Sequence, residues 1–334
     1  MLQNCPIRMQ SRIRLHAISF VLIAVLALAV YTNSLKGEFF WDDIGLIKEN
    51  HLIKNFSYLP QLFTRPISET LYYCYRPLLG LSFMADYSIW QLNPLGFHIT
   101  AVSIHILNAF LVYLLAFILS QDFKLGIATG LVFSVHSVLS EPVNYLASRA
   151  DLLIGLFCFS SFILYVLYRQ SGSKKKFLLS SSLILFICGM LSKEMAMVLI
   201  LMLLLYELIL AERREDIRRR LMFLVPYLIT LAVFAAIRAS VLKANMPSYI
   251  ERFAIAELPL WQRFSTSLTA IPTYLRLLLI PLGLHKEWLR QPVESVLTFN
   301  VIFSVAIVAV FLVLAKFIFR YARICTFGIL WFFV

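Results

Sequence analysis

The chain has 334 residues, of which 60% are hydrophobic and 14% are charged, and its formal net charge is +12 at pH 7. A soluble domain of this size cannot bury so much apolar surface, so the composition excludes a soluble globular protein. The positive charge does not indicate nucleic-acid binding, because the Lys and Arg residues lie in short loops between apolar runs, where membrane topology places them.

Apolar runs along the chain predict an all-α fold, a polytopic bundle of transmembrane helices. A helix of about 20 apolar residues crosses a bilayer. The predicted spans are residues 15–34, 97–119, 125–138, 150–168, 177–191, 194–210, 221–241, 264–281 and 299–319. The run 264–281 contains Pro272 and Arg276, so it can equally be re-entrant or interfacial.

The first apolar run allows two interpretations. Arg8, Arg12 and Arg14 precede it, and residues 27–29 (Ala-Leu-Ala) are similar to a signal-peptidase site. Because the run continues to Val30 and many spans follow, we expect an uncleaved membrane anchor.

Basic residues predict the orientation of the spans. The N-terminus and the loops 169–177 and 211–220 are rich in Lys and Arg, and alternating spans place all three in the cytoplasm. Residues 36–96, 136–150 and 192–194 then face the extracytoplasmic or luminal side. The expected location is a bacterial inner membrane or the endoplasmic reticulum.

One transmembrane domain is expected over residues 1–334, with residues 36–96 as its only long loop. Within that loop, Leu78–Trp90 has helical apolar spacing with polar residues interspersed, which favours a helix lying along the membrane interface. After Arg323 the apolar run is too short to span. We therefore expect the chain to be part of a longer protein, truncated at its C-terminus.

Two adjacent carboxylates follow the first span. Asp42 and Asp43 come directly after Phe39-Phe40-Trp41. A carboxylate against an aromatic wall can take a proton from a substrate. The alternative is a solvated helix cap, because Asp favours helix N-termini.

Other polar residues gather near the same face, at helix ends where they are costly unless solvated, paired or used. They are His136, Glu141, Arg149, Asp151, Lys193 and Glu194, with Arg76 in the long loop. The alternatives are a solvated hairpin tip for Lys193-Glu194 and interfacial snorkelling for Arg149 and Asp151.

A metal site is the least supported of these possibilities. Asp42, Asp43, His136 and Glu141 could bind a hard cation, but their spacing does not demand one. We expect no metal and no cofactor. The sequence has neither a Gly-rich phosphate loop nor a GxSxG elbow, so a soluble nucleotide donor is not indicated.

Seven short motifs resemble, in order and spacing, the transmembrane and tetratricopeptide-repeat O-mannosyltransferases of the GT-C superfamily. They are Phe39-Phe40-Trp41-Asp42-Asp43, Tyr75-Arg76-Pro77-Leu78, Asn93-Pro94-Leu95-Gly96-Phe97-His98, His105-Ile106-Leu107-Asn108, His136-Ser137-Val138-Leu139-Ser140-Glu141-Pro142-Val143, Ser148-Arg149-Ala150-Asp151 and Leu191-Ser192-Lys193-Glu194-Met195. The resemblance covers residues 30 to 210. Ser137, Leu139 and Thr100 depart from the family pattern, and tetratricopeptide repeats are missing from this chain.

The resemblance implies a GT-C-like fold that transfers a sugar, expected to be mannose, from a polyprenyl- or dolichyl-phosphate donor to a protein Ser or Thr hydroxyl, with inversion. It implies Asp42 or Asp43 as the general base, with a slight preference for Asp43. The implied roles of the others are donor-phosphate binding by Arg76, Arg149 and Lys193, and orientation of the acceptor or the base by His136, Glu141 and Glu194. The partners would be the lipid-linked sugar, an acceptor polypeptide and the bilayer.

Two other classes of function stay open. A transporter or flippase for a lipid-linked or anionic solute would place ionisable residues near the middle of the bilayer on broken helices. Arg238 and Arg276 are the residues that fit that pattern. A non-catalytic scaffold would give Asp42 and Asp43 no functional role.

Overall fold

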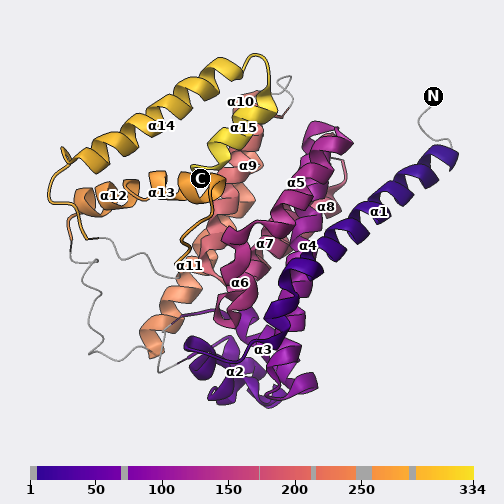
Figure 1. The fold of residues 1–334 in the computed structure, drawn as a ribbon, viewed down its shortest axis with the longest axis vertical. Helices are drawn as coiled ribbons and strands as arrows, with labels where there is room; N and C mark the ends of the chain where they lie inside the picture. The colour runs from indigo at the N-terminus through magenta and orange to yellow at the C-terminus, as the bar shows by residue number, and fades with distance from the viewer. Residues whose placement is uncertain (1–5, 69–73, 173, 212–215, 246–257, 286–290) are drawn as a thin grey trace. The chain divides into compact units, whose positions relative to one another are not determined.

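The computed structural model confirms the predicted fold class. It describes residues 6–68, 74–172, 174–211, 216–245, 258–285 and 291–334, with side chains from residue 13 onwards. Within these ranges the chain forms helices joined by turns, and no β-strand occurs in them (Figure 1). Arg213 and Arg214, in one of the predicted cytoplasmic loops, lie outside the described residues.

The contacts within the chain group it into two compact units. The predicted single transmembrane domain stays a prediction. The first unit comprises residues 1–204 and 211–245, and the second comprises residues 205–210 and 246–334. The reason lies in the packing: most helices between α1 (Pro6–Tyr31) and α11 (Val225–Asn245) contact one another, and the last four helices contact one another.

The remaining α-helices of the first unit form a bundle of long helices and several short segments. They are α2 (Leu59–Leu62), α3 (Pro77–Trp90), α4 (Pro94–Ser120), α5 (Phe123–Val135), α6 (Ser140–Asn144), α7 (Arg149–Gln170), α8 (Lys176–Ser192) and α10 (Ile217–Met222). Helix α9 (Val198–Ile209) follows α8. The second unit contains α12 (Leu260–Leu268), α13 (Ile271–Leu279), α14 (Phe299–Ile318) and α15 (Arg323–Trp331).

The chain is a multi-pass membrane protein by the length and apolarity of its helices. Five described helices are long and apolar enough to cross a bilayer: 13–36, 94–120, 146–170, 217–245 and 299–318. A sixth span arises if the pair 123–135 and 137–144, bent by 50°, crosses as one unit. The predicted orientation of these spans stays a prediction.

The predicted span 264–281 is not one helix. It is divided between α12 and α13, because the chain turns after Leu268 and Pro272 lies in the first turn of the second helix. Proline is favourable in a first helical turn and unfavourable in a helix interior. The alternative to a single span, suggested by Pro272 and Arg276, agrees with this break.

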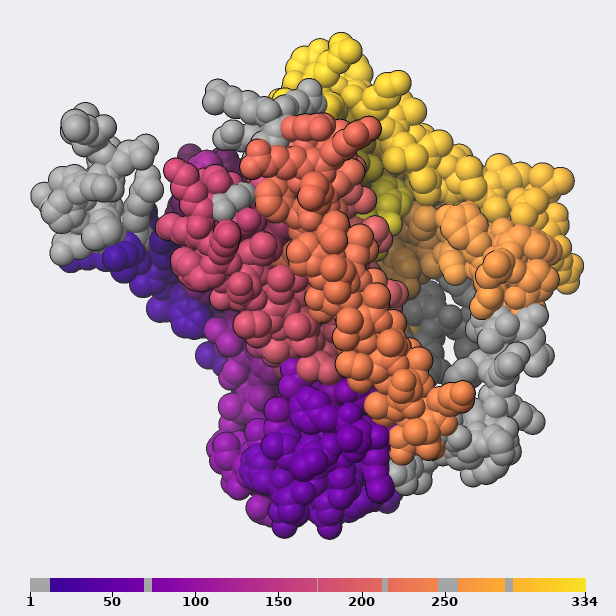
Figure 2. Space-filling model, turned by 180° about the vertical axis from the view of Figure 1, so that it is seen from behind, coloured from indigo at the N-terminus to yellow at the C-terminus, as the bar shows by residue number. Residues whose placement is uncertain are grey.

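The loop between α1 and α4 is a folded structure with its own apolar core. Leu46, Ile53 and Leu62 are buried in it and share one cluster with Phe97 and Leu146. Apolar burial of this kind is the main source of folding free energy. The core therefore joins the described residues of the loop to α4 and to the chain entering α7. Figure 2 shows α11, in orange, crossing this face toward the purple loop region.

The helix predicted over Leu78–Trp90 corresponds to α3, and its position at the membrane interface stays a prediction. Leu79, Phe83 and Met84 on this helix are buried in the loop core, while Ile89 is 70% exposed. The helix begins at Pro77, a residue whose fixed φ suits the first helical position.

Asn50 organises the first part of the loop. Its buried amide donates to the carbonyl oxygens of Leu46 at 3.2 Å and Ile67 at 2.9 Å, and its side-chain oxygen accepts from the Leu52 amide at 3.0 Å. Three backbone groups, in a stretch that runs from Leu46 to Ile67, thus form hydrogen bonds with one side chain.

We predict that Asn50→Ala destabilises the loop by about 2–3 kcal/mol, because it leaves buried backbone groups without partners. Asn55→Ala is the matched control: Asn55 is exposed and caps a single turn by accepting from the Ser57 amide at 2.9 Å. It should cost about 1 kcal/mol or less. Thermal unfolding of the detergent-purified protein measures both; equal losses would contradict the role given to Asn50.

Candidate functional site

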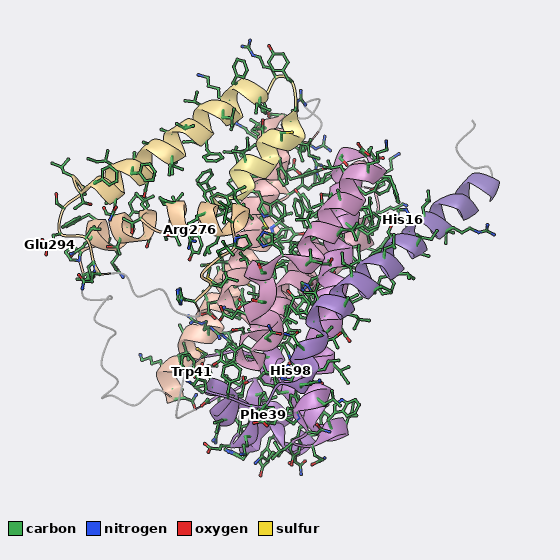
Figure 3. The ribbon with its side chains drawn as sticks, viewed as in Figure 1. His16, Phe39, Trp41, His98, Arg276 and Glu294 are labelled. Carbon is green, nitrogen blue, oxygen red and sulfur yellow. The ribbon has the colours of Figure 1, made fainter. Side chains whose placement is uncertain are left out.

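Asp42 and Asp43 lie in the turn that leads away from the first span. Trp41, directly before them, has a φ of 52° and is 60% exposed (Figure 3). A bulky residue in this left-handed conformation costs about 1–3 kcal/mol, and such strain is found most often at functional sites. Gly37 allows the turn to approach α4, because a Cβ there would lie 2.6 Å from Nε2 of His98.

Asp43 is completely buried and bound by backbone amides. Its Oδ1 accepts from the Ala147 amide at 2.7 Å, and its Oδ2 accepts from the Phe40 amide at 3.4 Å. Hydrogen bonds from N–H groups stabilise a carboxylate in its charged form. Asp43 therefore attaches its own turn to the chain that enters α7.

Asp42 is half-buried and is paired with Tyr145. The tyrosine hydroxyl donates to Oδ2 of Asp42 at 2.5 Å and accepts from the Asp42 amide at 3.2 Å. Burial raises the pKa of Tyr145, and its hydrogen bond to Asp42 raises it further. The hydroxyl therefore stays protonated near neutral pH and acts as a donor to the carboxylate.

Tyr145 was not among the residues singled out from the sequence. It lies between two of the motifs, with no charge and no characteristic spacing to distinguish it. Its partner is 103 positions away, so only the fold brings the two together. An aromatic residue beside a set of polar motifs was the only available signal.

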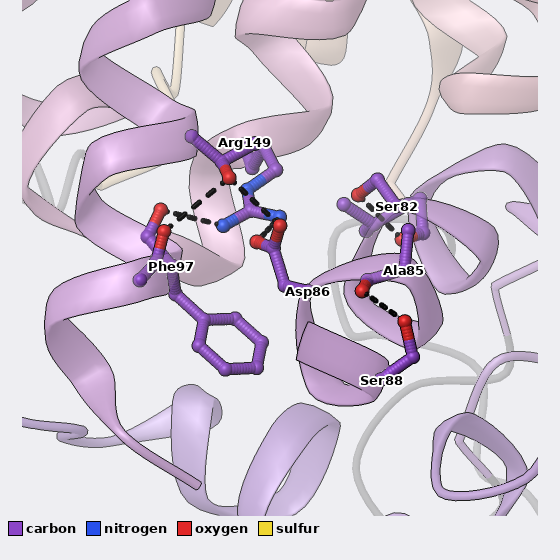
Figure 4. Close-up of polar contacts among 9 residues, drawn as sticks. Ser82, Ala85, Asp86, Ser88, Phe97 and Arg149 are labelled. Carbon is purple, nitrogen blue, oxygen red and sulfur yellow. Dashed lines mark hydrogen bonds and ion pairs between the residues drawn. The ribbon is translucent and has the colours of Figure 1, made fainter. Parts of the chain in front are cut away.

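Arg149 is fully buried at the start of α7 (Figure 4). Its Nη1 lies 2.6 Å from Oδ2 of Asp86, its Nη2 donates to the Phe97 carbonyl at 2.7 Å, and its guanidinium lies 4.8 Å from the centre of the Phe83 ring. Thr100 donates to the second oxygen of Asp86 at 2.7 Å. Because this guanidinium is enclosed and paired, the geometry gives no support to its predicted role in phosphate binding.

Arg76 and Lys193, the other two predicted phosphate ligands, are in a more open group. Arg76 Nη2 lies 3.3 Å from Oε1 of Glu194, and Arg238 Nη2 lies 3.9 Å from the same oxygen. Lys193 Nζ lies 2.7 Å from Oδ1 of Asp151. We call Arg76, Lys193, Glu194 and Arg238 the basic cluster.

The basic cluster contains polar atoms that the described chain does not satisfy. Nε of Arg76, Nε of Arg238 and Oε2 of Glu194 are buried without a hydrogen-bond partner among the described residues. Buried donors of this kind are rare in folded proteins and call for a ligand or water to satisfy them. Two guanidinium N–H groups are suited to bind an anion.

Glu194 is ionised in this setting. Burial acts to raise its pKa, but hydrogen bonding to its own backbone and the positive charges of Arg76 and Arg238 outweigh that effect, so the pKa lies below the ordinary value. The cluster therefore has two arginines beside the Glu194 carboxylate, and Lys193, its neighbour in the chain, pairs with Asp151. Arg238 is its unexpected member, since the sequence suggested it only as a mark of a transporter.

His136 and Glu141 lie in the turns that precede the Tyr145 segment. His136 accepts from the Val138 amide at 3.3 Å through Nδ1. Glu141 is exposed and accepts from the Ser148 hydroxyl at 3.2 Å. Their predicted orienting role stays a prediction. Among the described residues, no three His, Cys, Asp or Glu side chains are grouped to hold a metal ion.

One short segment joins these parts of the site. Tyr145 and Ala147 hold the two aspartates, Arg149 binds Asp86, and Asp151 pairs with Lys193, directly before Glu194. Residues 145–151 thus contact the turn after the first span, the α3–α4 junction and the basic cluster in succession. We call residues 145–151 the connecting segment.

Comparison with known proteins finds relatives named protein O-mannosyl-transferases. The chain is 28% identical to Tmtc2 of Drosophila melanogaster over 298 residues, which is 83% of this chain and 31% of that protein. It is 28% identical to TMTC3 of Homo sapiens over 200 residues, 57% of this chain and 22% of that protein. It is 31% identical to TMTC2 of Homo sapiens over 149 residues, 43% of this chain and 18% of that protein.

The comparisons confirm the family resemblance predicted from the motifs: the chain is a relative of the TMTC protein O-mannosyl-transferases. It spans less than one third of the length of these relatives. No protein-family model matches the chain. No solved structure matches it either.

We predict that Asp86→Asn destabilises the protein by about 3–5 kcal/mol, because it leaves the buried guanidinium of Arg149 without its counter-charge. Asp151→Asn is the matched control: its side chain is 44% exposed in the pair with Lys193, and exposed pairs contribute about 1 kcal/mol or less. Denaturation with urea in detergent compares the two variants. Similar losses in both variants would show that burial of the Arg149–Asp86 pair does not increase its contribution to the free energy of unfolding.

Proposed function

We propose that this relative of the TMTC protein O-mannosyl-transferases is the membrane part of a glycosyltransferase. It moves a sugar, mannose in our proposal, from a polyprenyl-phosphate donor to a Ser or Thr hydroxyl of a polypeptide. The observation that carries the proposal is the half-buried carboxylate of Asp42, held by Tyr145, on a folded loop that also supplies Arg76 to a cluster with unsatisfied anion-binding groups.

The chemistry requires one displacement. The acceptor hydroxyl gives its proton to the carboxylate as its oxygen forms a bond to the anomeric carbon. The bond between that carbon and the phosphate oxygen breaks, and the lipid phosphate leaves as an anion. Attack from the face opposite the phosphate inverts the anomeric centre.

We assign the base to Asp42 rather than to Asp43. A general base must come within hydrogen-bond reach of the hydroxyl that it deprotonates. Asp43 has no exposed surface and is held by two backbone amides, whereas Asp42 is partly exposed. The slight preference for Asp43 came with the family resemblance; burial supports the opposite order, in which Asp43 fixes the turn.

The leaving phosphate is assigned to the basic cluster. Its Nε–H groups on Arg76 and Arg238 are buried and without partners among the described residues, and a phosphate oxygen would satisfy both. A positive charge near the departing oxygen stabilises the negative charge that develops there. Lys193 adds a third cation, whereas Arg149 is committed to Asp86 and is left out of this assignment.

The position of the site suits a lipid-linked donor. The basic cluster draws on the loop, on α11 and on the turn after α8, where apolar helices end. The lipid tail can stay in the bilayer beside such helices while its sugar-phosphate reaches polar groups. We place this face on the extracytoplasmic or luminal side, following the predicted orientation.

We predict that Asp42→Asn lowers the rate of transfer by about 10²–10⁴-fold, the range for loss of a general base. Its unfolding temperature should stay near that of the unsubstituted protein, because the side chain is only half-buried. Mannose transfer from polyprenyl-phosphate mannose to an acceptor peptide, with the protein in lipid nanodiscs, is the measurement.

Asp43→Asn is the paired comparison and should lose stability as well as turnover. An amide NH₂ cannot accept from a backbone N–H, so either the Phe40 or the Ala147 amide loses its acceptor. Wild-type transfer by both variants would refute the glycosyltransferase assignment. Loss of activity only together with unfolding in both would make the pair structural.

We further predict that Arg76→Gln and Arg238→Gln each slow turnover by about 10²–10³-fold, the usual cost of removing one charge stabiliser. Donor KM should change less than kcat, because the charge to be stabilised grows as the phosphate leaves. Arg218→Gln, on an exposed arginine of α10, is the control and should leave both constants unchanged. A normal kcat in both Arg76→Gln and Arg238→Gln would show that the basic cluster has no role in the reaction.

A further inference from the structure

Tyr145 is almost fully buried, with 4% of its surface exposed, and its hydroxyl makes two hydrogen bonds with one residue, Asp42. It donates to a carboxylate oxygen of Asp42 and accepts from the backbone amide of the same residue. The two bonds close a small ring between side chain and backbone. Such a ring restricts the rotation of the Asp42 carboxylate about its own side-chain bonds.

The position of the tyrosine is itself fixed from several sides. Its ring lies 5.0 Å from the ring of Phe40, tilted by 43°. Two residues further along the chain, the Ala147 amide binds Asp43, and two residues beyond that, Arg149 is anchored to Asp86. The Tyr145 hydroxyl therefore reaches Asp42 from a part of the chain that is fixed by the contacts of Tyr145, Ala147 and Arg149.

We propose that Tyr145 is a positioning residue for the transfer reaction. It touches neither substrate in this proposal and acts through Asp42, by holding the plane of the carboxylate toward the acceptor hydroxyl. The inference rests on the proposed function. A misplacement of about 1 Å in a catalytic group can cost about 10²-fold in rate, which sets the scale of the effect.

The electrostatics agree with this geometry. Burial, and then the hydrogen bond to the neighbouring carboxylate, raise the pKa of the phenol, which favours its protonated form. A protonated phenol can orient a carboxylate without adding a charge to it. Tyr145 therefore differs from the cations of the basic cluster, which act on the leaving group.

The direct test is Tyr145→Phe, which keeps the buried ring and removes the hydroxyl. We expect kcat to fall by about 10–10²-fold, with the KM values for donor and acceptor within about twofold of the unsubstituted protein. Turnover is expressed per donor-binding site, measured by titration with polyprenyl-phosphate mannose, so that a loss of folded protein does not count as a loss of rate.

Tyr75→Phe is the matched control. Tyr75 lies in the loop between α1 and α4, is 3% exposed and donates its hydroxyl to the Phe63 carbonyl at 3.2 Å rather than to either aspartate. The Tyr75→Phe variant loses one buried hydrogen bond, and the Tyr145→Phe variant loses its hydrogen bonds to Asp42. We expect wild-type kcat per site from Tyr75→Phe; an equal fall in both variants would overturn the proposal and indicate a structural role.

A double-mutant cycle decides whether Tyr145 acts through Asp42. Residues in direct contact show non-additive effects. In an Asp42→Asn background, Tyr145→Phe should lower the residual rate by less than about twofold. A full 10–10²-fold loss there would show that the hydroxyl acts independently of Asp42 and would overturn the proposal.

The outcomes also separate this inference from the proposed function. If Asp42→Asn abolishes transfer and Tyr145→Phe transfers at the wild-type rate, only the role of Tyr145 fails. If Asp42→Asn itself transfers normally, the proposed base fails, and the role of Tyr145 fails with it.

Discussion

The buried ion pair of Arg149 and Asp86 is the interaction on which the extramembrane part of the structure depends. A charged guanidinium with no exposed surface is tolerated only when its hydrogen bonds and charge are matched. Here one side chain binds a carboxylate from α3 and a carbonyl from α4 while it starts α7. Three elements are thus held at one point, and the chain just before α7 is fixed where it meets the aspartates.

Residues of the same type in the sequence have different environments in the structure, and we assign them different roles. Asp42 and Asp43 are neighbours, but one is half-buried against a phenol and the other is sealed by backbone amides. Arg76 and Arg149 are both arginines of the conspicuous motifs, but Arg149 has no exposed surface and is paired with Asp86, whereas Arg76 is partly exposed beside Glu194. The local environment of a residue, rather than its type, therefore distinguishes the residues proposed to react from those that stabilise the structure.

The sequence predicted the helical membrane fold and a helix at α3 correctly, because hydropathy patterns are local. It did not predict the break between α12 and α13 with certainty, since one proline supports several outcomes. It could not distinguish the two aspartates or find Tyr145, because their difference arises from a contact across 103 positions. For the same reason the sequence could not show that Arg149 is paired, because its partner Asp86 lies on another helix.

The long separation of these contacts has a consequence for synthesis of the protein. Arg76 and Glu194 are 118 positions apart, so the basic cluster cannot form until the chain has been made beyond α8. Contacts between distant residues form late, because the loop that joins them must close first. Arg76 is therefore synthesised well before Glu194 and Arg238, whereas Arg149 follows its partners Asp86 and Phe97 in the chain. The nascent chain thus contains Arg76 before the carboxylate that pairs with it has been made.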